Sequence, residues 1–182
     1  MCKTKFIDLF FVDESSFNLE GYIPYGWQPA GQYITITPAK TKAKNIFGIM
    51  SLDNRLEAYE SKGSMNSAMV IAFIDDFIKK IKQPTVLVID NAPIHHSNAF
   101  KIKIEEWKKD DLYIFYLPKY APHLNPIEVL WRNIKYKWLE YENINNMEQL
   151  ENQLFHILNK FGQEYHINFK ELDDKKVSNI FA

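Results

Sequence analysis

The sequence of 182 residues contains a single cysteine, Cys2, so no disulfide can form within the chain. Chains without disulfides are typical of a reducing compartment. The five histidines and one cysteine also show no paired spacing of the kind that zinc sites use. These absences exclude a disulfide scaffold and argue against a zinc site, and we expect a cytoplasmic protein.

Long hydrophobic runs are missing as well. The longest, such as FIDLFFV, are interrupted by charge and are too short to span a bilayer. Lys3, Lys5 and Asp8 break any signal-peptide core near the start. The formal net charge is only −1, so no overall basic field attracts polyanions. We therefore expect no membrane association, and a nucleic-acid partner would need local basic patches.

What is present is an ordinary globular balance, with 46% apolar and 25% charged residues. No repeat or linker divides the chain, so residues 1–182 are expected to form a single domain. Runs rich in β-branched and aromatic residues predict the strands KFIDLFFVDESSF, QYITITP, KNIFGIMS, PTVLVID and DLYIFYLP. Helical spacing predicts helices over 64–82, 96–109, 126–139 and 146–161. This order predicts an α/β fold, a mixed central β-sheet with helices on its faces.

Three carboxylates fall at the ends of predicted elements. Asp13 lies near the end of the first strand, Asp90 ends the run TVLVI, and Glu128 lies in the first turn of a helix. Carboxylates that converge there could bind Mg²⁺ or Mn²⁺. Each also has a local explanation: Asp13 as a turn former, Asp90 as a turn or cap, and Glu128 as part of a capping box with Asn125. Patterning leaves both interpretations open.

Three longer motifs resemble a known family. VDESSF, VLVIDNAPIHH and YLPKYAPHLNPIEVLW are similar to the catalytic blocks of mariner-superfamily transposases, specifically the bacterial insertion-sequence six-thirty group. The blocks occur in the family's order, with spacings of 90 − 13 = 77 and 128 − 90 = 38 positions. The resemblance implies an RNase H-like fold and an Asp-Asp-Glu triad that binds two divalent ions, Mg²⁺ or Mn²⁺.

Carried onto this sequence, the resemblance makes Asp13, Asp90 and Glu128 the catalytic, metal-binding triad. It implies hydrolysis of a phosphodiester at the transposon end, followed by attack of the freed 3′-hydroxyl on target DNA. Because metal binding would draw Glu128 away from its own backbone, we expect Asn125 to cap the helix. We further expect the carboxylate of Glu128 to face Asp13 and Asp90.

The resemblance also implies an N-terminal helix-turn-helix region that recognises transposon ends. Met1 lies only twelve residues before Asp13, so we expect that region to be absent. Recognition of the ends would then require a homodimer or an assembly with a helix-turn-helix-containing chain. Two alternatives stay open: a non-catalytic fragment that associates with and regulates a full-length transposase, and an RNase H-like nuclease.

Several residues are candidate DNA contacts. Asn91 and His95 belong to the second motif, although His95 is also explained as a side chain at a helix N-terminus. Arg132 and Lys135 share a helix face with Glu128 and could hold phosphates. The cluster KTKAKN adds three further candidates: Lys40, Lys42 and Lys44.

Overall fold

The computed structural model describes residues 6–19, 43–61, 63–119 and 121–169. The predicted strand QYITITP lies outside these residues. The strands are β1 Asp8–Phe17, β2 Lys44–Ser51, β3 Leu56–Ser61, β4 Thr85–Ile89 and β5 Leu112–Tyr116. The α-helices are α1 Ser67–Phe77, α2 Asn98–Trp107, α3 Ile127–Asn133 and α4 Met147–Lys160. In the part of the chain so described, no helix combines the length and apolar character needed to cross a membrane.

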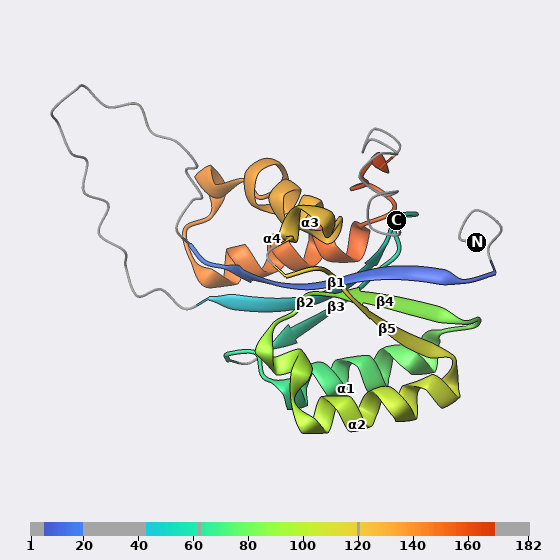
Figure 1. Ribbon diagram of the computed structural model, residues 1–182. Coiled ribbons are helices and arrows are strands. Elements are labelled where there is room, and N and C mark those ends of the chain that lie inside the picture. The colour runs from blue at the N-terminus through green and yellow to red at the C-terminus, as the bar shows by residue number, and fades with distance from the viewer. Residues whose placement is uncertain (1–5, 20–42, 62, 120, 170–182) are drawn as a thin grey trace, which may run out of the picture.

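The strands form one mixed sheet in the order β3-β2-β1-β4-β5. The pairs β1–β2 and β2–β3 are antiparallel, whereas β1–β4 and β4–β5 are parallel. Helices α1 and α2 cover one face of the sheet, and α3 and α4 cover the other (Figure 1). The predicted α/β fold, a mixed sheet with helices on both faces, is confirmed.

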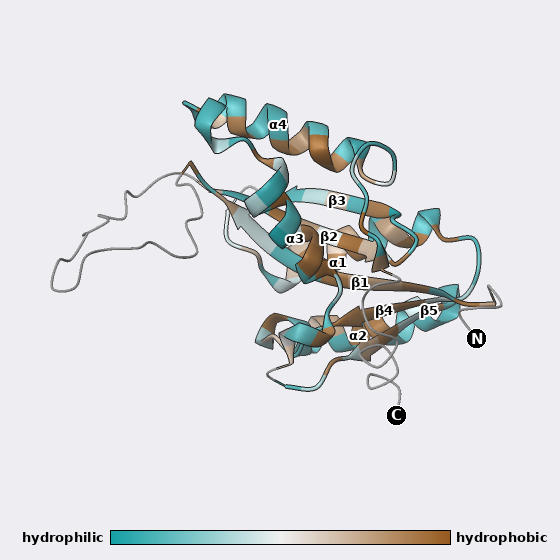
Figure 2. Ribbon diagram, turned by 90° about the horizontal axis from the view of Figure 1, so that it is seen from above, coloured by the Kyte–Doolittle hydropathy of each residue, from teal (hydrophilic) through white to brown (hydrophobic). Residues whose placement is uncertain are grey.

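Side chains of the central strands alternate between two cores. Phe10 and Leu87 pack toward α1 and α2, whereas Phe11 and Val88 pack toward α3 and α4. The hydropathy colouring of Figure 2 shows β1 and β4 as largely hydrophobic and α4 as mixed, with polar residues along its length. Because β1 and β4 are buried on both faces, they read as continuous apolar runs in the sequence.

The parallel pairing of β1 with β4 sets the geometry of the site. Asp8 pairs with Thr85 and Phe11 with Val88, so partners differ by 85 − 8 = 77 positions. The same interval separates Asp13 from Asp90, since 90 − 13 = 77. Continuing this register by two residues therefore places the two aspartates side by side.

Several element boundaries differ from the prediction; for example, the helix predicted over 126–139 is α-helical only from Ile127 to Asn133 and continues as a π-helix to Trp138. The helix predicted over 64–82 begins as α1 at Ser67, because the side chain of Asn66 accepts a hydrogen bond from the Met69 amide. Its α-helical part ends at Phe77, followed by a short 3₁₀ turn. Strand β3 was not predicted at all.

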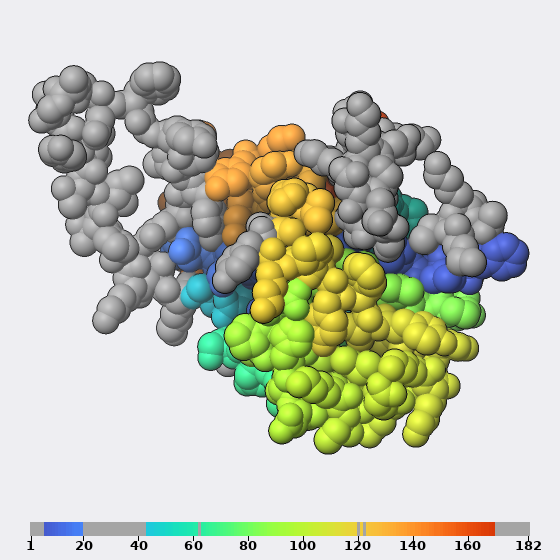
Figure 3. All heavy atoms as spheres, viewed as in Figure 1, coloured from blue at the N-terminus to red at the C-terminus, as the bar shows by residue number. Residues whose placement is uncertain are grey.

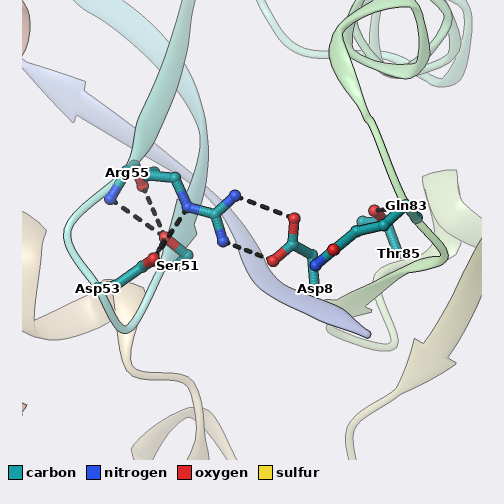
Figure 4. A network of polar contacts seen from close by, with 6 residues as sticks. All are labelled: Asp8, Ser51, Asp53, Arg55, Gln83 and Thr85. Atoms are coloured by element: carbon teal, nitrogen blue, oxygen red, sulfur yellow. Dashed lines mark hydrogen bonds and ion pairs between the residues drawn. The ribbon is translucent and has the colours of Figure 1, made fainter. Parts of the chain in front are cut away.

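An arginine joins the β2–β3 turn to the start of β1 at the end of the sheet remote from Asp13 (Figure 4). The guanidinium of Arg55 donates two hydrogen bonds to the Asp8 carboxylate, at 2.7 and 3.0 Å. Its Nε donates to Asp53, and the guanidinium lies 4.7 Å above the Phe10 ring. The bond from Arg55 holds the pKa of Asp8 below its ordinary value.

Asp8→Asn is expected to lower the free energy of unfolding by less than about 1 kcal/mol at pH 7, because Arg55 is half exposed. Since the folded-state pKa of Asp8 is depressed, its contribution is complete above the unfolded pKa of about 4 and is lost as the pH falls below it. Urea unfolding of wild type and variant at pH 7 and at pH 3 measures the difference in the free energy of unfolding at each pH. Asp53→Asn, at a more exposed partner of the same guanidinium, should have a smaller effect.

Candidate active site

Asp13 and Asp90 lie on the side of the sheet that α3 covers. Both continue the alternation of Phe11 and Val88, whose side chains pack toward α3. Asp90 directly follows β4. Asp13 lies in the second half of β1, which ends at Phe17 as the predicted strand does and pairs with β2 along that length.

Helix α3 brings Glu128 to the same place. Ile127, Leu130 and Trp131 are buried against the sheet, which leaves Glu128 exposed in the first turn. The prediction that Asn125 caps this helix is wrong: α3 has no side-chain cap. The buried amide of Asn125 donates instead to the Val12 carbonyl, 3.0 Å away on β1, because a buried carbonyl needs a donor.

The three carboxylates line one cavity of about 500 Å³, together with Asn91 and Asn125. Among the described residues, the Glu128 carboxylate accepts no hydrogen bond from the Asn125 amide, so the capping box does not form. In the space-filling view, the segment after β5, coloured yellow, crosses the face between the orange helices and the green α1–α2 layer (Figure 3). The residues that line the cavity place it between β1, the segments that follow β4 and β5, and the start of α3.

The carboxylates repel one another. Burial raises the pKa of Asp13 to about 7, with further contributions from the charges of Glu128 and Asp90. Burial also raises the pKa of Glu128, although Lys135 and Arg132 oppose this shift. Burial and neighbouring negative charges therefore disfavour the ionised form of Asp13, and a divalent cation would offset both effects.

His95 lies beneath Asp90 rather than on the surface. Its side chain is 6% exposed, and its Nδ1 lies 2.9 Å from Asp90 Oδ1. This hydrogen bond holds the pKa of Asp90 below its ordinary value. His95 lies in a short 3₁₀ turn before α2 with its ring enclosed by protein, and its predicted contact with DNA stays a prediction.

The side chain of Asn91 also forms hydrogen bonds within the protein. Its amide donates to the Leu117 carbonyl, and its Oδ1 pairs with His96 Nε2 at 3.0 Å. These contacts tie the segment after β4 to the end of β5. Asn91 still lines the cavity, so its predicted contact with DNA stays a prediction.

The predicted basic contacts divide into three groups. Arg132 is exposed, and Lys135 lies on the same helical segment with its ammonium 5.3 Å above the Phe17 ring. Lys44 forms ion pairs with Glu60 at 2.6 Å and Glu151 at 2.9 Å, so its charge is balanced within the fold, and the DNA contact predicted for it stays a prediction. The predictions for Lys40 and Lys42 lie outside the described residues.

Two residues at the site were not singled out by sequence. Trp131 donates its indole N–H to Asp13 Oδ2 at 3.0 Å. Gly48 lies opposite Asp13 in the β1–β2 register, directly beneath the Trp131 ring. The glycine inside the predicted strand KNIFGIMS was the available signal, since such a glycine often marks a close approach.

Comparison with known protein families shows which family the chain belongs to. Residues 8–151 match the family described as DDE superfamily endonuclease. The chain belongs to this family. The matched segment of this DDE domain contains Asp13, Asp90 and Glu128, and the predicted relationship is confirmed at the level of the DDE endonuclease superfamily.

Related proteins are longer than this DDE domain. It is 24% identical over 159 residues to the insertion element IS630 uncharacterized 39 kDa protein of Shigella sonnei, a match that covers 82% of the chain and 44% of that protein. The chain therefore spans less than half the length of this curated relative.

Solved structures agree on the fold. The Mos1 strand transfer complex superposes with a TM-score of 0.64 at 16% identity, over 94% of this chain and 54% of that one. The catalytic domain of Mos1 mariner transposase superposes with a TM-score of 0.56 at 13% identity, over 84% of this chain and 70% of that one. The predicted RNase H-like fold is confirmed.

The donor set fits a hard divalent cation. Three carboxylates share the cavity wall, and the buried Oδ1 of Asn125 has no hydrogen-bond partner among the described residues. Oxygen donors of this kind are what Mg²⁺ and Mn²⁺ select. Within the described ranges, no three Asp, Glu, His or Cys side chains come close enough to form a complete site, so binding would require the carboxylates to draw together.

Proposed function

We propose that this chain is the catalytic domain of a transposase, which cuts DNA at transposon ends and joins the freed 3′ end to target DNA with Mg²⁺ or Mn²⁺. The observation that carries the proposal is that Asp13 of β1, Asp90 directly after β4 and Glu128 of α3 line one cavity. Related structures were solved with Mn and with Mg, which supports the choice of metal.

In this proposal Asp13, Asp90 and Glu128 hold one or two ions. The bound metal would polarise the scissile phosphodiester and lower the pKa of the attacking water or hydroxyl. The chain's own part is positioning: β1 and β4 fix two carboxylates in register, and α3 supplies the third. Arg132 and Lys135, beyond Glu128 on the same helical segment, would hold the phosphates that flank the cut.

The test is Mg²⁺- or Mn²⁺-dependent nicking of DNA that carries the cognate inverted repeats. We expect cleavage by the wild-type chain, supplied where necessary with a helix-turn-helix-containing chain, and none after Asp90→Asn or addition of EDTA. Preferential cleavage of RNA–DNA hybrids would contradict the proposal in favour of an RNase H-like nuclease. Self-association without cleavage would favour a regulatory fragment.

Partners follow from the same proposal. The titles of the related structures describe a strand transfer complex and paired-end complexes of Mos1. For this chain we propose DNA as the partner, with assembly as a homodimer or with a chain that carries the helix-turn-helix region. Sedimentation of the chain with and without end DNA would measure the assembly.

Lys135→Ala is expected to weaken DNA binding several-fold and to flatten its salt dependence by about one unit of slope, as loss of one phosphate contact predicts. Fluorescence anisotropy across a salt series measures both values. Lys79→Ala is the control, because Lys79 is 72% exposed beyond α1 on the other side of the sheet. An unchanged slope after Lys135→Ala would remove this residue from the DNA contacts.

A further inference from the structure

One aromatic side chain connects two of the three carboxylates. Trp131 lies three residues after Glu128 on α3, and its indole N–H donates to Asp13 Oδ2 on β1 at 3.0 Å. The side chain is buried, and its ring and that of Phe17 pack in an edge-to-face arrangement with centroids 6.1 Å apart. The same residue therefore anchors α3 in the core and bonds a carboxylate of the proposed site.

Gly48 provides the space that this arrangement needs. It is the partner of Asp13 in the β1–β2 register. A Cβ at this position would lie 2.7 Å from Trp131 Cη2 and 2.8 Å from Cζ2, distances that real Cβ atoms do not adopt. Any larger residue at Gly48 would push the indole away from the sheet, and with it the N–H from Asp13.

The hydrogen bond suits a metal ligand. A carboxylate has about four lone-pair positions, so one N–H donor fixes its plane and leaves the others for a cation. Asp13 needs such a donor, since it is buried beside the like charges of Glu128 and Asp90. Groups that orient a ligand in this way are as much part of a metal site as the ligands themselves.

We propose that Trp131, seated on Gly48, is a positioning residue that orients the Asp13 carboxylate for metal binding and couples its placement to that of Glu128. This role rests on the proposed function, because it assumes that Asp13 binds the metal. It predicts that loss of the indole N–H weakens the binding of metal more than it disturbs the fold.

The first measurement is Mn²⁺ affinity of the full chain by titration calorimetry. Trp131→Phe removes the N–H and keeps an aromatic ring, and we expect about tenfold weaker Mn²⁺ binding. In cleavage assays, kcat should fall while KM for DNA stays the same. Trp107→Phe is the matched control: this buried indole donates to Asp75 at 2.7 Å between α2 and α1, so its loss should leave Mn²⁺ affinity within about twofold of wild type.

A double variant separates the hydrogen bond from packing. Gly48→Ala should lower both the melting temperature and the Mn²⁺ affinity, because the indole must move. Phenylalanine lacks the two indole atoms that the new Cβ would meet most closely, and the remaining contact is the flexible end of Ile127, with Cδ1 at 3.0 Å. Gly48→Ala combined with Trp131→Phe should therefore recover most of the melting temperature but not the affinity. Recovery of both would overturn the positioning role and leave only packing.

Two outcomes distinguish this proposal from the one on which it rests. A wild-type chain that binds Mn²⁺ with an affinity unchanged by Trp131→Phe would overturn the role of Trp131 only. Equal losses in Trp131→Phe and Trp107→Phe would assign the effect to general stability and overturn it too. A wild-type chain that binds no Mn²⁺ would contradict the proposed function itself.

Discussion

Asp13→Asn is expected to abolish metal-dependent cleavage and, at the same time, to raise the melting temperature of the metal-free protein. The ionised carboxylate is buried beside Glu128 and Asp90, so it destabilises the fold in the absence of a cation. The neutral amide removes this repulsion, and its oxygen can still accept the Trp131 N–H. Sites arranged for function commonly reduce stability in this way.

The stability that Asp13→Asn is expected to gain over wild type depends on pH. Because the folded-state pKa of Asp13 is raised to about 7, the wild-type chain loses stability as the pH rises from about 4 to 7. At pH 8 the variant should therefore be more stable by about 1–3 kcal/mol, allowing for partial relaxation, and near pH 4 the difference should vanish. Calorimetric melting in EDTA at both pH values measures it.

Asp110→Asn is the control for this substitution, since Asp110 is exposed in a turn remote from the cavity. It should change neither cleavage nor melting temperature. A lower melting temperature of Asp13→Asn at pH 8 would show that the carboxylate is stabilised by partners other than a cation. Retained cleavage would remove Asp13 from the triad.

The second large effect is expected at His95. His95→Phe should weaken Mn²⁺ binding about 10- to 100-fold, as the loss of a hydrogen bond that orients a metal ligand typically does. The ring packs against Phe100 with centroids 5.6 Å apart, so phenylalanine preserves that contact while removing the bond to Asp90. The Tyr116 hydroxyl donates to the backbone carbonyl of His95, which the substitution retains.

His95→Asn separates orientation from volume. Its amide nitrogen can take the place of Nδ1, so its Mn²⁺ affinity should lie closer to wild type than that of His95→Phe, despite the smaller side chain. His156→Phe, at an exposed position on α4, is the control for loss of an imidazole. Equal affinities of wild type and His95→Phe would show that Asp90 needs no support from this ring.

The central strands could be predicted because they are buried on both faces. TVLVI and LFFV contain few polar residues, and β4 and β1 occupy these segments. Strand β3 could not be predicted in this way, because it lies at the edge of the sheet and only Ser61 among its six residues is buried. Glu57 and Glu60 interrupt any hydrophobic signal there, and their ion pairs with Lys80 and Lys44 depend on tertiary structure.

The positions of the three carboxylates could be predicted from motifs, but the contacts of the residues around them could not. Asn125 has the sequence features of an N-cap, yet burial directs its amide to the Val12 carbonyl. Trp131 reads as a core residue, and only the fold shows that its polar edge meets Asp13. Contacts between residues more than a hundred positions apart leave no local pattern.

The β1–β4 register has a consequence for how such domains can change over evolution. Insertions in the connections between the strands alter the number of residues that separate Asp13 from Asp90 without moving either one. A single-residue insertion inside β4, by contrast, would turn Asp90 to the α1–α2 side of the sheet. The lengths of the loops can therefore change, whereas the number of residues from the paired part of each strand to its acid must keep both side chains on the α3 side of the sheet.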